Sequence, residues 1–288
     1  MEIKRSYRRR GSPDFPLAMY LSNAENISHF CNPEYHPEQE IVLVEAGVVV
    51  LQLDGEVKTF RKGDVFSIPG NAVHCYRVCS DDALTISLVF DIKVISMQPD
   101  HFFQNTFTQP LAEGRLQLPA LLQPGHPAYE AVYKGFRQLK QTRIYDKDYK
   151  LRRFVILMGI CADLLPYCTA VEEQKKDNCH GNEAVRLCMR HIHSQYMEKL
   201  TLKKLAQVSH LHPNYLCALF KEHTGETVFE YLVRFRVETA AELLKKEDLP
   251  VGKVGEMVGF RSESLFYRQF KAVMGVTPKE YARQHAGK

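Results

Sequence analysis

A few histidine and acidic side chains in the first third of the chain could bind a metal ion or a polar ligand. His36 and Glu40 are four residues apart, and His74 follows further along. Two imidazoles and a carboxylate are suitable ligands for zinc or another divalent transition metal. With the phenol of Tyr76, the same groups could instead hydrogen-bond a small polar molecule such as a sugar. They could also be scaffold residues at strand ends. We favour the small-molecule pocket, and we therefore expect no metal and no other cofactor.

The elements that would position these groups are short strands between residues 35 and 95. The segments 41–44, 48–53 and 65–68 are rich in β-branched residues and are separated by turn residues. Asp54-Gly55 predicts a two-residue hairpin, because glycine tolerates a positive φ. Many short strands with regular turns favour a sandwich or barrel.

The next region is predicted to be helical and to end in a linker. A first helix follows residue 127, and a second spans residues 149–165. The second is apolar on most sides in its latter half, so it must bury more than one face. Packing on the barrel and a dimer seam containing Ile156 both satisfy this requirement. Residues 171–182 are polar and lack periodicity, which is typical of a linker.

The C-terminal third contains a repeated pattern. Leu205-Ala206 and the later Phe220-Lys221 correspond to Val254-Gly255 and Phe270-Lys271, and each copy ends at a glycine. Each copy predicts a short helix, a turn and a second helix, at about 212–224 and 263–274. The connector 227–246 would be about 30 Å long as a helix, close to the rise of one turn of B-DNA.

The distribution of charge agrees with a nucleic-acid partner for this third. From Asn182 onward there are 17 Lys and Arg residues against 12 Asp and Glu residues, whereas residues 1–181 are close to neutral. All of the basic excess therefore lies where a phosphate-binding surface would need it. The excess is too small for a protein that compacts DNA without regard to sequence.

Helical geometry predicts which side chains of the two second helices point outward. In the second copy Phe266 and Phe270 point inward. Arg268 could donate two hydrogen bonds to a guanine, or contact a phosphate. Gly252 and Gly255 in one short helix lower its helix propensity, so the second copy is expected to be less rigid. The predicted outward residues are Asn214, Cys217, Ala218 and Lys221 in the first copy and Glu263, Ser264, Tyr267, Arg268 and Lys271 in the second.

Residues 201–281 resemble the DNA-binding domain of the AraC/XylS transcription regulators. The resemblance implies two helix-turn-helix units that bind successive major grooves of double-stranded DNA, with contacts at the positions of Glu263, Ser264, Tyr267 and Arg268. It also implies a homodimer, a small-molecule effector and RNA polymerase as partners. The matched residues are Val258-Gly259-Phe260, Ser262, Ser264, Phe266, Arg268, Phe270-Lys271, Gly275, Thr277-Pro278 and Tyr281, and in the connector Tyr231-Leu232, Arg236, Ala240 and Leu243-Leu244.

Residues 36–74 resemble the cupin barrel that such regulators carry. His36-x3-Glu40 matches the second half of the first cupin motif, and Gly63-x5-Pro69-x4-His74 matches the second motif. Glu34 stands at the first histidine of the motif, and Asn71 stands at a glycine. The resemblance implies a sensory domain with an effector pocket at His36, Glu40, His74 and Tyr76.

These observations predict an α+β protein of two domains. Residues 1–170 form a cupin-like β-barrel with a helical dimerisation segment, 171–182 form the linker, and 183–288 form an all-α domain with two helix-turn-helix units. The function expected is a ligand-responsive transcription regulator rather than an enzyme. The alternative is a metal-dependent cupin enzyme with an appended helical domain, which leaves the repeat unexplained.

The sequence also predicts the compartment. The cysteines are scattered without a CxxC pair, which is typical of reduced thiols in the cytosol. No apolar segment follows the basic N-terminus as in a signal peptide. The longest apolar run, Phe154 to Cys168, is too short to span a bilayer. We therefore expect a cytoplasmic protein without a membrane partner.

Overall fold

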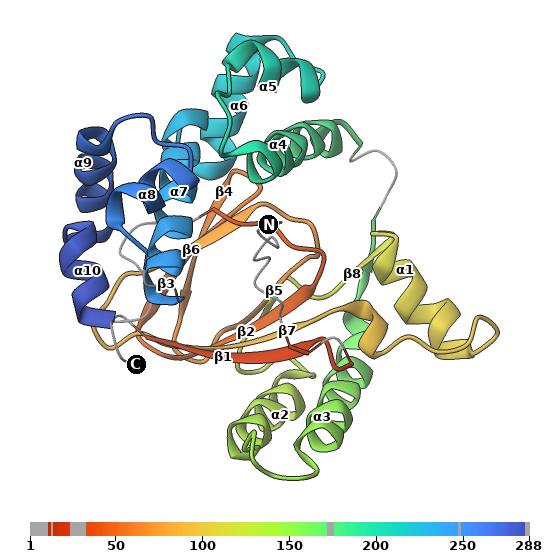
Figure 1. The fold of residues 1–288 in the computed structure, drawn as a ribbon. Helices are drawn as coiled ribbons and strands as arrows, with labels where there is room; N and C mark the ends of the chain where they lie inside the picture. The colour runs from red at the N-terminus through yellow and green to blue at the C-terminus, as the bar shows by residue number, and fades with distance from the viewer. Residues whose placement is uncertain (1–10, 13, 24–32, 172–175, 247–248, 286–288) are drawn as a thin grey trace. The chain divides into compact units, whose positions relative to one another are not determined.

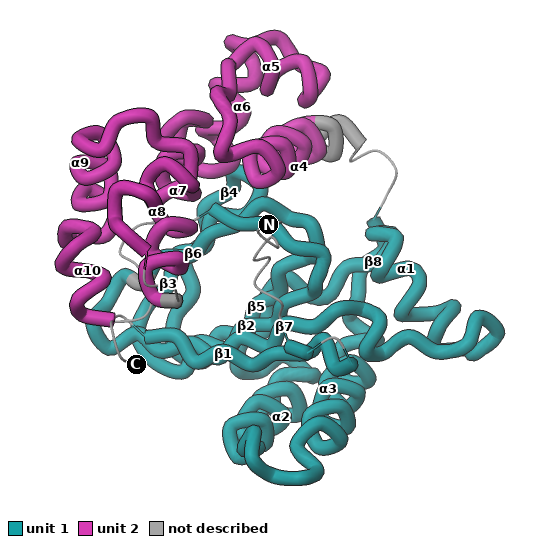
Figure 2. Tube along the Cα trace, viewed as in Figure 1, with its two compact units in different colours: residues 1–177 teal, residues 178–288 magenta. Residues whose placement is uncertain are grey.

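The chain folds into two compact units, residues 1–177 and residues 178–288 (Figures 1 and 2). The computed structural model describes residues 11–12, 14–23, 33–171, 176–246 and 249–285. Helix α4 (Lys176–Gln195) begins inside the segment 171–182 that the sequence suggested as a linker. The prediction is wrong for residues 176–182, because extending an existing helix backward is far easier than nucleating one. Residues 172–175 lie outside the described residues.

The two larger antiparallel sheets of residues 1–177 are as expected for a cupin barrel, and β8 (Leu116–Gln117) and β10 (Thr169–Ala170) pair as a small separate sheet. The hairpin predicted at Asp54-Gly55 is confirmed, with φ values of 47° and 90° at the two turn residues. One sheet has the order β1 (Leu17–Asn23), β7 (Leu84–Phe90), β2 (Gln39–Ala46), β5 (Val65–Ile68) and β9 (Leu121–Leu122). The other has the order β4 (Glu56–Arg61), β3 (Val48–Leu53) and β6 (His74–Val78).

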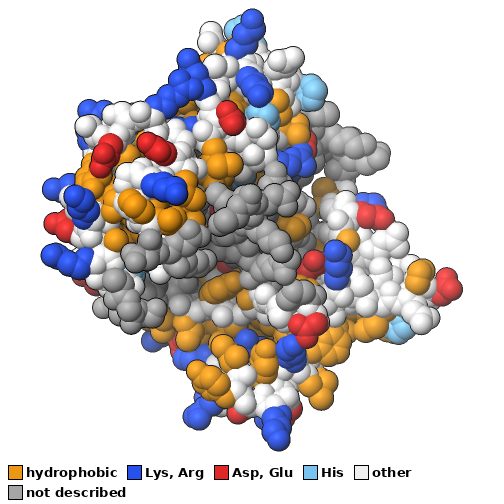
Figure 3. All heavy atoms as spheres, viewed as in Figure 1, with side chains coloured by type: hydrophobic (Ala, Val, Ile, Leu, Met, Phe, Trp, Pro, Cys, Tyr) orange, Lys and Arg blue, Asp and Glu red, His pale blue; other side chains and the backbone are white. Residues whose placement is uncertain are grey.

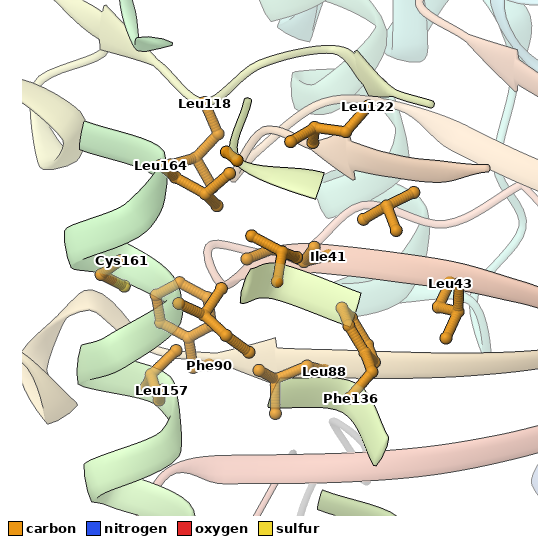
Figure 4. Packing of buried hydrophobic residues seen from close by; sticks show 14 of the residues in the cluster. Ile41, Leu43, Leu88, Phe90, Leu118, Leu122, Phe136, Leu157, Cys161 and Leu164 are labelled. Atoms are coloured by element: carbon orange, nitrogen blue, oxygen red, sulfur yellow. The ribbon is translucent and has the colours of Figure 1, made fainter. Parts of the chain in front are cut away.

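Helices α2 (Tyr129–Gln141) and α3 (Tyr149–Leu164) share one hydrophobic core with the larger sheet. Figure 4 shows Leu157, Cys161 and Leu164 on α3, with Phe136, Ile41 and Phe90 in the same cluster. The two helices approach closely at Gly135, where an added Cβ would lie 2.8 Å from Cγ1 of Ile160. The smaller elements are η1 (Ile92–Val94), the π-helix η2 (Gln104–Thr108), α1 (Gln109–Ala112), β8 (Leu116–Gln117), η3 (Leu165–Tyr167) and β10 (Thr169–Ala170).

The outer face of α3 differs from the sequence prediction. Ile156 is partly buried and packs against the core, so it does not lie on the face left open for a partner. The reason is its place on the helix beside Leu157 and Ile160, both of which point at the sheet. The exposed apolar side chains of α3 are instead Leu151 and Val155, which are 65% and 59% exposed.

The second unit contains the two helix-turn-helix units. The first comprises α5 (Leu202–Val208) and α6 (Pro213–Thr224), and the second comprises α8 (Val251–Met257) and α9 (Glu263–Met274). Helix α7 (Val228–Lys246) joins them, and α10 (Pro278–His285) packs on α7 and α9. The predicted positions of the two second helices, the connector and the glycine helix ends are confirmed. Gly225 and Gly275 both end their helices in the left-handed conformation.

Close packing explains Gly255 in helix α8. An added Cβ at Gly255 would lie 2.7 Å from Cδ1 of Phe266, which is fully buried. Gly255 therefore makes room for an aromatic ring, and the looseness expected from its helix propensity is not the reason for its presence.

Two further facts concern thiols and membranes. Cys75 is disulfide-bonded, unlike the reduced thiols that the sequence suggested. Among the described residues no helix is both long and apolar enough to cross a membrane.

Candidate DNA-binding surface and buried histidine cluster

The two second helices expose nearly all of the side chains expected to face DNA. Local sequence fixes both helix starts, since Pro213 occupies the first turn of α6 and the Ser262 hydroxyl accepts from the Leu265 N–H of α9. Lys and Arg side chains stand out on the surface of the C-terminal unit (Figure 3). The exposed members of the predicted set are Asn214, Cys217, Ala218, Lys221, Glu263, Ser264, Arg268 and Lys271.

Tyr267 does not fit the prediction. Its side chain is half-buried and packs against the core of the second unit, edge to face with Phe266 at 6.1 Å between ring centroids. Its hydroxyl is buried. Tyr267 follows Phe266 at the border of the inward face, and its long ring leans back over the core. Tyr267 therefore supports the position of α9, and its hydroxyl is not presented to DNA.

One pair of exposed positions was missed by the sequence reasoning. Tyr215 on α6 is 57% exposed, and Leu265 on α9 is 38% exposed. They occupy the same place in the two copies of the repeat. Large apolar side chains at matching exposed positions of two polar helix faces were the signal that could have identified them.

The loop between α4 and α5 connects the two helix-turn-helix units through Arg236 of α7. The Arg236 guanidinium donates from Nε to the Tyr196 carbonyl at 2.7 Å and from Nη2 to the Glu198 carbonyl at 2.9 Å. The same loop lies against the turn of the second unit, where an added Cβ at Gly259 would be 2.8 Å from the Met197 carbonyl oxygen. The loop that leads into the first helix-turn-helix unit is thus held against the turn of the second helix-turn-helix unit.

A buried histidine cluster in the N-terminal unit, residues 1–177, is assembled from three segments. Glu34 and His74 face each other in an antiparallel bridge, with both N–H···O distances at 2.9 Å. His36 lies just before β2, and the Asn71 N–H donates to its carbonyl at 2.6 Å. Asn71 has a φ of 65°, a conformation that asparagine tolerates, which explains how it replaces a glycine. Glu40 lies on β2, where β7 and β5 flank it.

The cluster brings together His36, Glu40 and His74, and it adds Glu34. The side-chain Nε2 atoms of His36 and His74 lie 3.6 Å and 3.8 Å from the same carboxylate oxygen of Glu40. Oε1 of Glu34 is 3.9 Å from Nε2 of His74. His36, Glu40 and His74 are each at most 4% exposed. The sequence placed Glu34 only at a motif position, and the structure makes it a member of the cluster.

The hydrogen bonds of the two rings define their tautomers. Nδ1 of His74 is 2.9 Å from the Ala72 carbonyl oxygen, and Nδ1 of His36 is 3.2 Å from the Glu38 carbonyl oxygen. A carbonyl can only accept, so each Nδ1 carries a proton, and the Nε2 atom of each ring faces the Glu40 carboxylate. Burial, followed by the proximity of His36, lowers the pKa of His74 and favours its neutral form.

Tyr76 lies in the wall beside the cluster. Its hydroxyl is 3.4 Å from the Ser87 hydroxyl, so its polar end is already used in part by the protein. Burial raises the pKa of Tyr76, and the Glu40 carboxylate raises it further. Tyr76 therefore remains neutral and can bind only by hydrogen bonding.

Comparisons with known proteins give the family of both units. A model of the cupin domain matches residues 28–91, and a model of the helix-turn-helix domain matches residues 205–284, which contain α5 to α10. An uncharacterized HTH-type transcriptional regulator of Bacillus subtilis, YdeC, is 22% identical over 95% of this chain and 94% of its own length. The chain therefore combines an AraC-type helix-turn-helix domain with a cupin domain, and its relatives are named HTH-type transcriptional regulators.

Other relatives of this AraC-type regulator include regulators and solved structures. The MmsAB operon regulatory protein of Pseudomonas aeruginosa is 23% identical over 89% of this chain and 78% of its own length. ToxT from Vibrio cholerae has a TM-score of 0.47 at 13% identity, over 94% of this chain and 98% of its own. The C-terminal domain of AraT from Geobacillus stearothermophilus has a TM-score of 0.34 at 33% identity, over 35% of this chain and 84% of its own.

Proposed function

We propose that this AraC-type regulator is ligand-responsive and reads promoter DNA with α6 and α9 in successive major grooves. The observation that carries the proposal is the pair of exposed polar helix faces at matching positions of the two units. Helix α7 has 19 residues and is about 28 Å long at 1.5 Å per residue. That length is comparable with the pitch of B-DNA, which two reading helices on one face of the duplex require.

Each exposed side chain has a proposed role. Arg268 donates two hydrogen bonds to a guanine, Asn214 pairs with an adenine, and Glu263 accepts from a cytosine. Ser264 contacts a base edge or a phosphate, and Cys217 and Ala218 touch a thymine methyl group. Lys221 and Lys271 bind phosphates, which position the protein without reading sequence.

The test is DNA binding by the full chain at several salt concentrations. We expect the affinity for promoter DNA to fall steeply as salt rises, because bound phosphates release counterions. Lys271→Ala should weaken binding to all sequences and reduce the salt slope by about one. Lys93→Ala, which removes a lysine that is 82% exposed in the other unit, is the control and should change neither. Binding that is insensitive to salt, or unchanged by Lys271→Ala, would contradict the proposal.

We further propose that two copies associate through the outer face of α3. Leu151, Val155 and Gly159 lie at intervals of four residues on this face, and all three are exposed. An antiparallel two-fold pairing of the helices would bury this stripe and bring Arg152 at one end next to Asp163 of the other copy. Regulators that read paired half-sites commonly form such dimers.

The dimer is tested by sedimentation. Val155→Glu places a charge on the stripe and should shift the protein from dimer to monomer at micromolar concentration. Val57→Glu is the matched control, because Val57 on β4 is 63% exposed and lies off the stripe. A monomeric wild-type protein, or a Val155→Glu variant that still dimerises, would exclude this interface.

The remaining partners follow from the same proposal. The effector would bind at His36, Glu40 and His74, with Tyr76 in the wall. A regulator bound at a promoter acts on RNA polymerase, which is the other macromolecular partner we propose. Its place of action is then the cytoplasm, where a bacterial promoter lies.

A further inference from the structure

We propose that His223 is a positioning residue that fixes the reading helix α6 against helix α4 through a hydrogen bond with Asn182. Helix α4 is the element at which the chain passes from residues 1–177 into the C-terminal unit. The inference rests on the proposed function, because it takes α6 as one of the two helices that bind DNA. It adds a residue that does not touch DNA but sets how α6 presents the residues that do.

His223 lies on the side of α6 opposite to the exposed face. It follows Asn214 by two and a half helical turns, so the two side chains point in opposite directions. The side chain of His223 is 8% exposed, whereas Asn214 is fully accessible from outside. The buried face of α6 on which His223 lies is mostly apolar, and its apolar members are Leu216, Leu219 and Phe220.

Both ring nitrogens of His223 face an oxygen atom of the protein. Nδ1 is 2.9 Å from the Leu219 carbonyl oxygen, one turn earlier in α6, and Nε2 is 2.6 Å from Oδ1 of Asn182 on α4. The first contact fixes the ring on its own helix, and the second ties that helix to α4. The two helices are close at this point, since an added Cβ at Gly181 would lie 3.4 Å from Cδ1 of Leu219.

A hydrogen bond on an apolar helix face has a specific consequence for the orientation of the helix. Apolar contacts are not directional, so a helix held by them alone can rotate or slide by small amounts at little cost. A hydrogen bond requires a defined distance and angle. A single buried polar contact can therefore select one register between two helices, as a buried asparagine does in coiled coils. The Asn182–His223 contact selects one setting of α6 in this way.

Helix α4 is itself firmly held, so it can serve as the support for α6. At its other end, Nε2 of His193 is 2.7 Å from the hydroxyl of Tyr231 on the connector α7, and the His193 ring stacks on Phe235 with 4.3 Å between ring centroids. The apolar face between the two ends is at most 4% exposed and consists of Ala184, Val185, Cys188, Met189 and Ile192.

The second reading helix is positioned in another way. The two copies of the repeat are 50 residues apart, so Val273 occupies in α9 the place that His223 occupies in α6. Valine cannot form a side-chain hydrogen bond, and Val273 packs partly buried against the core. Aromatic contacts hold α9 instead, with Phe270 5.6 Å from Phe266 and 5.6 Å from Tyr281 between ring centroids. The effect of His223 should therefore be confined to the half-site that α6 binds.

The experiment measures how strongly the full chain discriminates each half-site of a DNA sequence selected by the wild-type protein. Discrimination is the ratio of the affinity for this DNA to the affinity for DNA in which one half-site alone is scrambled, at fixed salt. The half-site of α6 is the one at which Asn214→Ala lowers the ratio. Both affinities in a ratio come from the same preparation, so partial unfolding of a variant cancels.

Two substitutions at His223 separate the hydrogen bond from packing. A glutamine amide reaches about as far as Nε2 of histidine and can still bond to Asn182, whereas an asparagine amide reaches only as far as Nδ1. His223→Asn should lower discrimination at the α6 half-site by roughly fivefold, because a hydrogen bond changes an equilibrium constant by about two- to tenfold. His223→Gln should remain within roughly twofold of wild type. Neither should change discrimination at the α9 half-site.

Asn182→Ala removes the other partner and should cause the same loss as His223→Asn. Asn182 lies on α4, so this loss cannot come from a missing DNA contact. The double variant should lose no more than either single variant, because both substitutions remove one contact. Val273→Ala is the matched control, which trims the equivalent position of α9 and should leave the α6 half-site unchanged. Circular dichroism and melting temperature show that each variant is folded, and Asn182→Ala decides the test if His223→Asn does not fold.

The inference is overturned if the folded variants have a lower melting temperature but discriminate the α6 half-site as wild type does, because His223 would then only support the fold. Equal losses at both half-sites would also overturn it. So would equal losses in His223→Gln and His223→Asn, since the hydrogen bond to Asn182 would not be the cause. A wild-type chain that binds no DNA, or an Asn214→Ala variant that changes neither half-site, would instead refute the proposed reading by α6.

Discussion

The two helix-turn-helix units are copies of one pattern, but they achieve the same turn in different ways. His210 in the first unit and Gly259 in the second both have a positive φ, 55° and 92°. The turn of the first unit has room for a side chain there. The turn of the second lies against the Tyr196 and Met197 backbone, where even a Cβ would be within 2.9 Å of three backbone atoms.

The cores of the two helix-turn-helix units also differ, because the second packs more closely around a glycine. Ala206 and Leu216 pack in the first unit where Gly255 and Phe266 pack in the second, so a smaller helix residue accompanies a larger partner. The comparison teaches that Gly255 and Gly259 in the second helix-turn-helix unit are positions of close approach. They do not make the unit loose.

The largest expected loss of stability comes from a substitution at Gly259, in the turn of the second helix-turn-helix unit. Gly259→Ala should destabilise the second unit by about 2–4 kcal/mol, because it combines a left-handed φ with a backbone clash. Gly275→Ala is the matched control: Gly275 has a φ of 77° and nothing within 4 Å of an added Cβ. It should lose only about 1 kcal/mol from backbone strain. Urea unfolding followed by circular dichroism measures both, and equal losses would show that the clash with the loop is absent.

A second pair of substitutions sharpens the account of helix α8. Gly255→Ala should destabilise by about 1–2 kcal/mol, because overpacking against Phe266 exceeds the gain in helix propensity. Gly252→Ala, in the same helix, should stabilise by about 0.5–1 kcal/mol, since the nearest atom to its Cβ is the Glu263 carboxyl carbon at 3.5 Å. The opposite signs are the prediction. Stabilisation by both substitutions would mean that Gly255 has no packing role.

The smallest effect concerns the starts of the two reading helices. Ser262→Ala should destabilise by about 1 kcal/mol, because the Ser262 hydroxyl accepts from the Leu265 N–H. His212 occupies the same place before α6 and makes no side-chain cap hydrogen bond. His212→Ala should therefore change the free energy of unfolding by less than about 0.5 kcal/mol. A comparable loss in both variants would contradict the difference between the two helix starts.

Local signals in the sequence predicted most of the fold. The Asp54-Gly55 turn and the glycine ends of α6 and α9 depend on a few neighbouring residues, and all are as expected. The predictions that failed depend on distant contacts. Ile156 is held by the α2–α3 packing, and α4 begins early because its helix extends backward from its buried half.

The candidate site residues were also predicted well by local patterns and poorly where distant contacts decide their position. Helical geometry gave the outward set of α6 and α9 but misplaced Tyr267, whose ring lies on the border of the buried face. Motif spacing suggested His36, Glu40 and His74 as a group. Only the folded chain shows that both Nε2 atoms converge on the Glu40 carboxylate and that Glu34 joins them, because these contacts link residues from three segments.

The most direct test of the central claim, that both units read DNA sequence, is a binding-site selection with the full chain. Wild type, Asn214→Ala and Arg268→Ala are each selected against randomised DNA at fixed salt. Each variant should lose preference in its own half-site alone, and Arg268→Ala should relax one base pair by about 1–3 kcal/mol. We expect the loss from Arg268→Ala to be at least as large as that from Asn214→Ala. If Asn214→Ala removes most of the sequence preference and Arg268→Ala leaves it intact, the second unit does not read sequence and the account is contradicted.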